Sequence, residues 1–248
     1  MIRKIKRIFF KNRPKADPRL LADFDTLREM EKSSPKRFSL NQEDFYPCLN
    51  DNTPSTGFDR HYVYHPAWAA RIIAEVKPAK HVDISSALQF CSVLSAFVPV
   101  DFYDYRPANL SLSNLNSLSA DLLSLPFENN SIESLSCMHT IEHIGLGRYG
   151  DPLDYDGDIK AVNELKRVLA VGGHLFFVVP IGRLNRIFFN AHRVYTKQQV
   201  LDLFPDLVLK DFTLIPEDEK DGGLVSDPNE QLLERQVYGC GCFYFTKE

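Results

Sequence analysis

Hydrophobic positions from residue 66 onward alternate between two spacings. Trp68, Ile72, Ile73 and Val76 share a helical face that Pro78 ends, and residues 88–97 and 158–170 repeat the same three- and four-residue spacing. Short apolar runs separate them, at residues 80–84, 98–105, 133–138 and 174–180, and another short extended segment ends at residues 119–122. Strands that alternate with helices in this way predict right-handed crossovers and a parallel sheet. Two more extended segments follow, at residues 211–215 and 236–245.

The first 60 residues have a different pattern, so we expect an N-terminal extension of residues 1–60 and an α/β domain of residues 61–248. Residues 1–15 contain seven Lys or Arg and no acid, with isoleucines at helical spacing. This basic amphipathic segment is either a solvated arm, a helix that covers the body, or a contact to an anionic membrane surface. Residues 16–60 are polar, and their pattern predicts no element.

Composition excludes several classes of protein. The chain has 248 residues, is 44% hydrophobic and carries a net charge of −4, as an ordinary globular protein does. Its longest apolar run, residues 175–181, is far shorter than the ~20 residues of a membrane-spanning helix. A net charge of −4 without a basic groove disfavours long nucleic acid as a partner.

Cysteine usage points to a reducing, cytoplasmic compartment. The five cysteines form no C-x-x-C pair, so we predict neither a disulfide framework nor a metal site. Cys240 and Cys242 would share one face of a strand, where buried free thiols are expected.

The residues that follow each predicted strand carry the candidate chemistry, because ligands bind at the carboxyl ends of the strands in an open parallel sheet. Small residues at 85–87 would let a ligand approach the backbone. Asp104 would accept hydrogen bonds from two ribose hydroxyls, and Asp121 beside Leu122 suits an adenine amino group and its ring. Together these positions predict an adenosine site, although an acid after the second strand also suits NAD.

Two segments resemble the class I S-adenosylmethionine-dependent methyltransferases. They are SADLLSLPFENNSIESLSCMHTIEHI at 119–144 and NELKRVLAVGGHLFFVVP at 163–180. The resemblance spans roughly residues 80–215, and EHIGLGRYGDPLDYDGD at 142–158 resembles a branch described as a domain of unknown function. It implies a Rossmann-like three-layer sandwich around a mostly parallel seven-stranded sheet, whose antiparallel last strand residues 236–245 would supply.

The same resemblance implies that S-adenosyl-L-methionine is the cofactor and assigns it residues. Asp83, Ser85, Ser86 and Ala87 would wrap its methionine part, Asp104 and Tyr105 its ribose and adenine, Asp121 and Leu122 the adenine edge, and His139 would lie under the reactive methyl. The family's first motif is D/E-x-G-x-G-x-G, whereas this chain has D-I-S-S-A-L-Q at residues 83–89.

Residues after the fourth and fifth strands are the candidates for the acceptor side. Glu142, His143 and His192 are the candidate catalytic residues, with either histidine as general base. Arg193 and Tyr195 beside His192 would either anchor a loop or contact the acceptor.

Glycines and aspartates between residues 145 and 158 invite a metal interpretation. An EF-hand fails because aligning the loop glycine would place Pro152 at the first ligand position. A looser Mg²⁺ site at Asp151, Asp154 or Asp156 stays open.

The function predicted from these residues is methyl transfer to an oxygen or nitrogen of a small molecule, a sugar or a glycan. A lipid-linked glycan at a membrane surface is included because of the basic N-terminus. One alternative is a catalytically inert protein that binds the cofactor, since the first motif lacks its glycines. A nicotinamide-dependent dehydrogenase is more remote, because the chain has no G-x-G-x-x-G.

Overall fold

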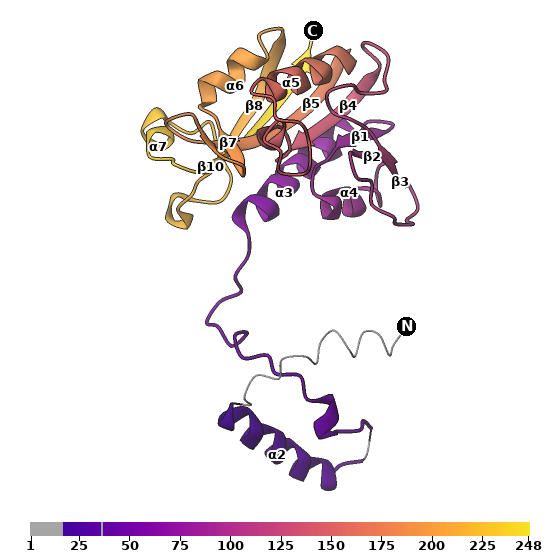
Figure 1. Cartoon of the computed structure of the whole chain (residues 1–248), viewed down its shortest axis with the longest axis vertical. Helices are drawn as coiled ribbons and strands as arrows, with labels where there is room; N and C mark the ends of the chain where they lie inside the picture. The colour runs from indigo at the N-terminus through magenta and orange to yellow at the C-terminus, as the bar shows by residue number, and fades with distance from the viewer. Residues whose placement is uncertain (1–16, 36) are drawn as a thin grey trace. The chain divides into compact units, whose positions relative to one another are not determined.

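The computed structural model describes residues 17–35 and 37–248, and the chain divides into two units between Gly57 and Phe58. The first contains helix α2 (Pro18–Lys32) and the 3-10 helix η1 (Gln42–Asp44) (Figure 1). α2 begins where the Asp17 carboxylate accepts the Arg19 N–H at 2.8 Å. Hydrophobic patterning missed this helix because it buries no residue. The predicted amphipathic segment, residues 1–15, lies outside the described residues.

The second unit is built on an eight-stranded sheet with the order β3-β2-β1-β4-β5-β10-β8-β9. The strands are β1 (His81–Ile84), β2 (Val100–Asp104), β3 (Leu115–Ser119), β4 (Ile132–Met138), β5 (Leu169–Ile181), β8 (Leu207–Ile215), β9 (Val225–Ser226) and β10 (Gly239–Lys247). β1 to β5 pair in parallel, and β10 runs antiparallel between β5 and β8. The mostly parallel sheet with an antiparallel last strand is confirmed, and the two-residue β9 adds an eighth strand at one edge.

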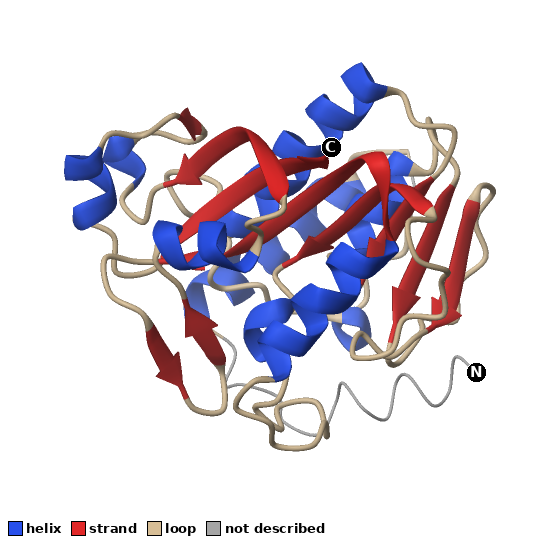
Figure 2. Cartoon of the chain, turned by 90° about the horizontal axis from the view of Figure 1, so that it is seen from above, coloured by secondary structure: helices blue, strands red, loops and turns tan. Residues whose placement is uncertain are grey.

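Helices pack along both faces of this sheet (Figure 2). α3 (Arg60–Val76) and α4 (Leu88–Leu94) cover one face, while α5 (Gly157–Val168), α6 (Lys197–Leu203) and α7 (Glu230–Glu234) cover the other. The 3-10 helices η2 (Ile141–His143) and η3 (Glu219–Asp221) and the hairpin of β6 (Arg186–Phe188) and β7 (His192–Val194) complete the unit. Within the described residues, no helix combines the length and apolar character that crossing a membrane requires.

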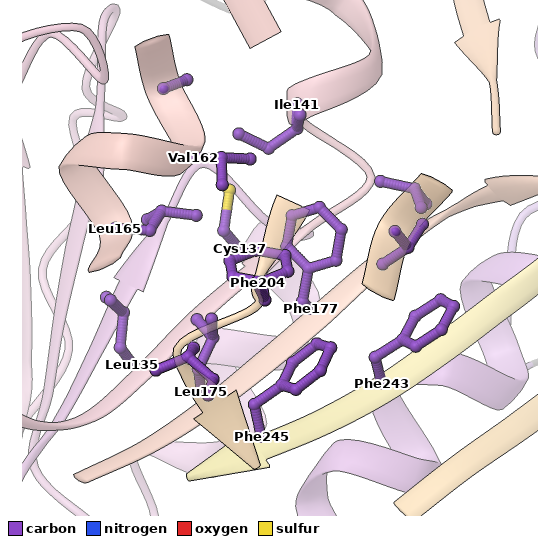
Figure 3. Close-up of a cluster of buried hydrophobic side chains, with 14 of the residues drawn as sticks. Leu135, Cys137, Ile141, Val162, Leu165, Leu175, Phe177, Phe204, Phe243 and Phe245 are labelled. Atoms are coloured by element: carbon purple, nitrogen blue, oxygen red, sulfur yellow. The ribbon is translucent and has the colours of Figure 1, made fainter. Parts of the chain in front are cut away.

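Alternation along β5 divides the core into two layers. Phe176 and Val178 pack with the α3 and α4 face, whereas Phe177 and Val179 pack with the α5 and α6 face. Figure 3 shows the second layer, in which Phe177 lies among Cys137, Val162, Phe204 and Phe243. Full burial of such a side chain stabilises the fold by about 1.5–3 kcal/mol.

The boundary between α5 and β5 differs from the sequence prediction. The hydrophobic spacing predicts a helix over residues 158–170, but α5 ends at Val168 and β5 begins at Leu169, ahead of Gly172 and Gly173. Leu169 pairs with Ile132 of β4, and the register then shifts before the main ladder begins. Gly172 has a φ of +78°, which a glycine adopts at no steric cost, so the pair forms a bulge within the strand.

Candidate active site

A cavity of about 330 Å³ opens at the carboxyl ends of β1 to β4. The strand order reverses between β1 and β4, so the cavity lies at the topological switch point of the sheet. Seven predicted site residues line it: Ser85, Asp104, Tyr105, Asp121, Leu122, His139 and His143. They follow four different strands, and the fold brings them to one place.

Asp83, Ser86 and Ala87 lie outside this cavity. The buried Asp83 carboxylate accepts hydrogen bonds from the Ser86 N–H at 2.9 Å and from the Ser136 hydroxyl. Burial outweighs these bonds and raises the pKa of Asp83 to about 6. Ala87 lines a separate apolar groove between α3 and α4. Asp83 and Ser86 therefore stabilise the loop after β1 through hydrogen bonds outside the cavity.

The loop after β1 adopts the conformation of a glycine turn without a glycine. Ser85 has a φ of +57°, in the left-handed region that L-residues adopt at a cost. Hydrogen bonds hold it there: its N–H donates to the Tyr103 carbonyl at 2.8 Å, and its own carbonyl accepts from the Thr140 hydroxyl at 3.0 Å. The Ser86 hydroxyl also accepts the Met138 N–H at 2.9 Å, which joins the loops after β1 and β4.

Two carboxylates flank the cavity with fixed orientations. Asp104 accepts the Arg106 N–H at 2.7 Å through Oδ1, and Asp121 accepts the Leu123 N–H at 2.9 Å in the same way. Each carboxylate thus organises its own loop through one oxygen and has a second oxygen for a ligand. The buried Leu122 supplies an apolar surface beside Asp121.

His143 and His192 lie on the same side of the sheet, with ring centroids 6.5 Å apart. His143 Nδ1 is 2.6 Å from the Ala191 carbonyl, and its Nε2 is 3.7 Å from Glu142 Oε1. Burial is the main factor that lowers the pKa of both histidines. Both are therefore neutral near pH 7 and able to accept a proton.

Glu142 is buried beneath the cavity floor. Its Oε1 accepts a hydrogen bond from His139 Nδ1 at 2.9 Å, whereas its buried Oε2 has no hydrogen-bond partner. Burial opposes a charge on His139, but the neighbouring Cys240 and Glu142 outweigh it and raise the pKa of His139 to about 10. Glu142 thus holds His139 rather than facing the cavity, which it does not line.

The sequence missed several residues that surround His139. The rings of His61 and Tyr62, from the first turn of α3, lie 5.2 and 5.3 Å from the His139 ring. Cys240 of β10 places its Sγ 3.4 Å from His139 Nε2. The helix predicted from the sequence begins at Trp68. The spacing of His61 and His65, which lie four residues apart on one helical face, was the signal for an earlier start.

Arg193 and Tyr195 anchor loops. Arg193 is buried and donates to the carbonyls of Ile144 at 2.6 Å and Tyr155 at 3.0 Å, and the Tyr195 hydroxyl donates to Asp158 at 2.9 Å. Of the two interpretations left open for this segment, the geometry favours the anchor for both residues.

The aspartates of the glycine-rich loop are also engaged. Asp151 accepts the N–H groups of Gly145 at 2.7 Å and Tyr149 at 3.2 Å, and Asp154 pairs with Lys160 at 2.6 Å. These bonds lower the pKa of both carboxyls. Asp151 and Asp154 thus hold the loop, and within the described residues the aspartates of this loop, Asp156 included, form no group of potential metal ligands.

Solved structures share this architecture. The chain aligns with a 1,6-didemethyltoxoflavin-N1-methyltransferase from Burkholderia thailandensis over 96% of its own length and 93% of that chain, with a TM-score of 0.54 and 10% identity. An S-adenosylmethionine-dependent methyltransferase from Leishmania major aligns over 77% and 74%, with a TM-score of 0.51 and 10% identity. The chain has the class I methyltransferase fold.

The family model that matches this sequence covers a smaller part of the chain than the structural alignments do. Residues 123–211 match a family model described as "Caenorhabditis protein of unknown function, DUF268". This segment runs from the loop after β3 into β8 and contains His139, Glu142, His143 and His192. No curated protein sequence matches the chain.

Proposed function

We propose that this chain transfers a methyl group from S-adenosyl-L-methionine to an oxygen or nitrogen of a small polar acceptor. The observation that carries the proposal is the cavity at the switch point, which is lined by Asp104 and Asp121 from the ends of two neighbouring strands and by His139 and His143 after β4. The Burkholderia methyltransferase of the same fold contains S-adenosylhomocysteine and its substrate.

The described residues fit this cofactor. Asp104 would accept hydrogen bonds from the ribose hydroxyls through its remaining oxygen, with Tyr105 beside the adenine. Asp121 would accept from the adenine amino group, and Leu122 would pack on the ring. Ser85 lets the backbone approach the methionine part, while Asp83 and Ser86 hold that loop and Ala87 continues it into α4.

The chemistry needs alignment and one proton acceptor. The bound cofactor supplies an electrophilic methyl group, so the chain's main contribution is to align the acceptor atom, which can be worth about 7–11 kcal/mol. As the new bond to the acceptor forms and the carbon–sulfur bond breaks, His143 Nε2 would take the acceptor's proton. Glu142 would support the resulting imidazolium from 3.7 Å. His192 is the second candidate base.

A small molecule, a sugar or a glycan is the acceptor class that this arrangement suits. His143 and Tyr149 line the cavity, and His192, which does not line it, lies 6.5 Å from His143 between ring centroids. A contact of residues 1–15 with anionic membranes would bring a lipid-linked glycan within reach. Deleting these residues should abolish sedimentation with anionic vesicles and leave cofactor affinity unchanged.

Thermal-shift and calorimetric titrations with S-adenosylmethionine, S-adenosylhomocysteine and NAD test the proposal. A ligand at a hundredfold excess over its dissociation constant stabilises the fold by about 2.7 kcal/mol. We expect this shift with both adenosyl compounds and none with NAD. Labelled methyl transfer to a panel of hydroxylated and amino compounds then identifies the acceptor class. Stabilisation by NAD alone would refute the proposal, and binding without transfer to any compound would favour the inert alternative.

A further inference from the structure

Three potential metal ligands converge next to the cavity. One ligand atom from each of His61, His139 and Cys240 lies within 4.8 Å of the other two. The residues come from the first turn of α3, the loop after β4 and strand β10, so only the tertiary fold brings them together. His139 and Cys240 are buried, and His61 is partly buried.

The donor set and spacing match a known kind of metal site. Two imidazoles and one thiolate are ligands that Zn²⁺ prefers, and tetrahedral zinc places neighbouring N and S ligands about 3.5 Å apart. His139 Nε2 and Cys240 Sγ already lie 3.4 Å apart. The His61 ring stacks on the His139 ring with centroids 5.2 Å apart, so the His61 side chain would have to turn to direct a nitrogen at the ion.

The surroundings of His139 match the outer shell of a metal site. Metal-binding histidines usually donate their second ring N–H to a carboxylate, which fixes the ring and its tautomer. His139 Nδ1 does this with the buried Glu142 at 2.9 Å, which turns Nε2 towards Cys240. The backbone of His139 is held at a φ of +55°, outside the common region for a non-glycine residue.

A fourth ligand position would face the proposed reaction. His139 also lines the 330 Å³ cavity, whereas His61 and Cys240 do not, so His139 connects the cluster to that space. Three protein ligands and one open position are the arrangement of catalytic zinc sites. The second oxygen of Glu142, Oε2, is buried without a hydrogen-bond partner, so the carboxylate can strengthen its bond to His139 when an ion binds.

We infer that His61, His139 and Cys240 bind a divalent zinc ion whose open position receives the acceptor oxygen. Binding releases the thiol proton of Cys240, together with the Nε2 proton where His139 is charged, and both go to solvent. The ion would act as a Lewis acid on the acceptor. That role rests on the proposed methyl transfer, whereas zinc binding itself does not.

Zinc titration of the chelator-treated full chain tests the inference. Calorimetry and competition with a chromophoric chelator should give one Zn²⁺ per chain. We expect His61→Ala and Cys240→Ala each to lower the affinity at least about hundredfold, because each removes one of three ligands and even the loss of a ligand's hydrogen-bond partner costs about 10–100-fold. Cys242→Ala is the matched control, since Cys242 is a buried thiol on the same strand and face that contacts Cys240 but is not one of the three ligands. It should bind zinc as the wild type does.

Cobalt substitution gives a second readout. A thiolate–Co²⁺ charge-transfer band should appear in the wild type and in Cys242→Ala and be absent in Cys240→Ala. His61→Ala alters a partly exposed position, so it keeps the inference falsifiable if Cys240→Ala does not fold. Substoichiometric zinc, or equal affinity in the wild type and His61→Ala, would overturn it. S-adenosylhomocysteine binding measured without metal reports on the proposed function separately.

Discussion

His143 Nδ1 lies 2.6 Å from the backbone carbonyl of Ala191, and this contact fixes the tautomer of the histidine. A carbonyl oxygen can only accept, and a lone pair on Nδ1 would face it at 2.6 Å, so the shorter contact favours a hydrogen on Nδ1 although Arg148 Nη1 also lies 3.2 Å from this nitrogen. Arg148 also donates to this carbonyl at 3.1 Å and therefore adds a second donor to the same oxygen. In the neutral ring, Nε2 is left with a lone pair. The geometry thus prepares His143 as a proton acceptor.

Removing the His143 side chain should slow the chemical step and leave binding intact. We expect His143→Ala to lower turnover on the identified acceptor by about 10²–10⁴-fold, because a general base typically contributes that much. The melting temperature and the affinity for S-adenosylhomocysteine should stay near wild-type values. His174→Ala is the control, because His174 lies beside Tyr244, away from the cavity. Turnover that falls only in proportion to lost stability would make His143 a structural residue.

Asp104 should contribute to cofactor affinity more than to folding. Loss of a charged hydrogen bond costs about 1.5–3 kcal/mol, so Asp104→Ala should weaken S-adenosylhomocysteine binding about ten- to hundredfold. The melting temperature without ligand should barely change, since its bond to Arg106 is exposed. Asp101→Ala changes an acid of the same strand that pairs with Lys80 instead. Equal calorimetric affinities for wild type and Asp104→Ala would remove Asp104 from the site.

The left-handed backbone at Ser85 should make two substitutions differ in their effect on stability. Ser85→Gly relieves a conformational cost of about 1–2 kcal/mol but adds about 0.5–1 kcal/mol of chain entropy, so stability should change little. It also loses the hydroxyl bond to Tyr103 at 3.2 Å. Ser85→Val places a β-branched side chain in the same conformation and should destabilise by more than about 2 kcal/mol. Urea unfolding measures both, and equal effects would mean that the backbone at Ser85 is not left-handed.

Asp83 should give the fold a measurable pH dependence. Its pKa is about 6 in the fold against 3.8 in the unfolded chain, so between these values only the folded chain holds the proton. Stability relative to Asp83→Asn should therefore rise by about 3 kcal/mol as the pH falls from above 6 to about 4. His81, whose pKa burial lowers to about 3, is present in both proteins and cancels. Parallel stability curves from urea unfolding across this range would contradict the prediction.

The sequence predicted the order of strands and helices because the side chains that each element buries recur at the spacing typical of a helix or a strand. The apolar runs at 80–84 and 133–138 became β1 and β4 almost residue for residue. Asp104 at the end of β2 and Asp121 after β3 could be placed at one edge of the sheet, because the carboxyl ends of parallel strands lie at the same edge. Asp83 could not be separated from them by sequence, since only coordinates show that its carboxylate turns back to Ser136.

The hydrophobic pattern of the sequence did not predict contacts between elements that are distant along the chain. The first turn of α3 carries His61 and Tyr62 on a polar stretch, so no apolar stripe marked it as part of the site. Cys240 and Cys242 were correctly expected to be buried thiols on one face, yet only the fold shows that Cys240 meets His139. Arg193 could be assigned to anchoring only once its carbonyl partners were known.

The hydrogen bonds that join the loops after β1 and β4 also bear on how fast a ligand binds. Thr140 and Ser86 fix both loops to each other, so the wall of the cavity is complete before a ligand arrives. When these loops are already in the conformation that binds the ligand, no slow rearrangement of the protein follows the encounter. Its observed association rate should therefore rise linearly with concentration and reach no plateau, and differences in affinity among variants of the wall should lie in the dissociation rate.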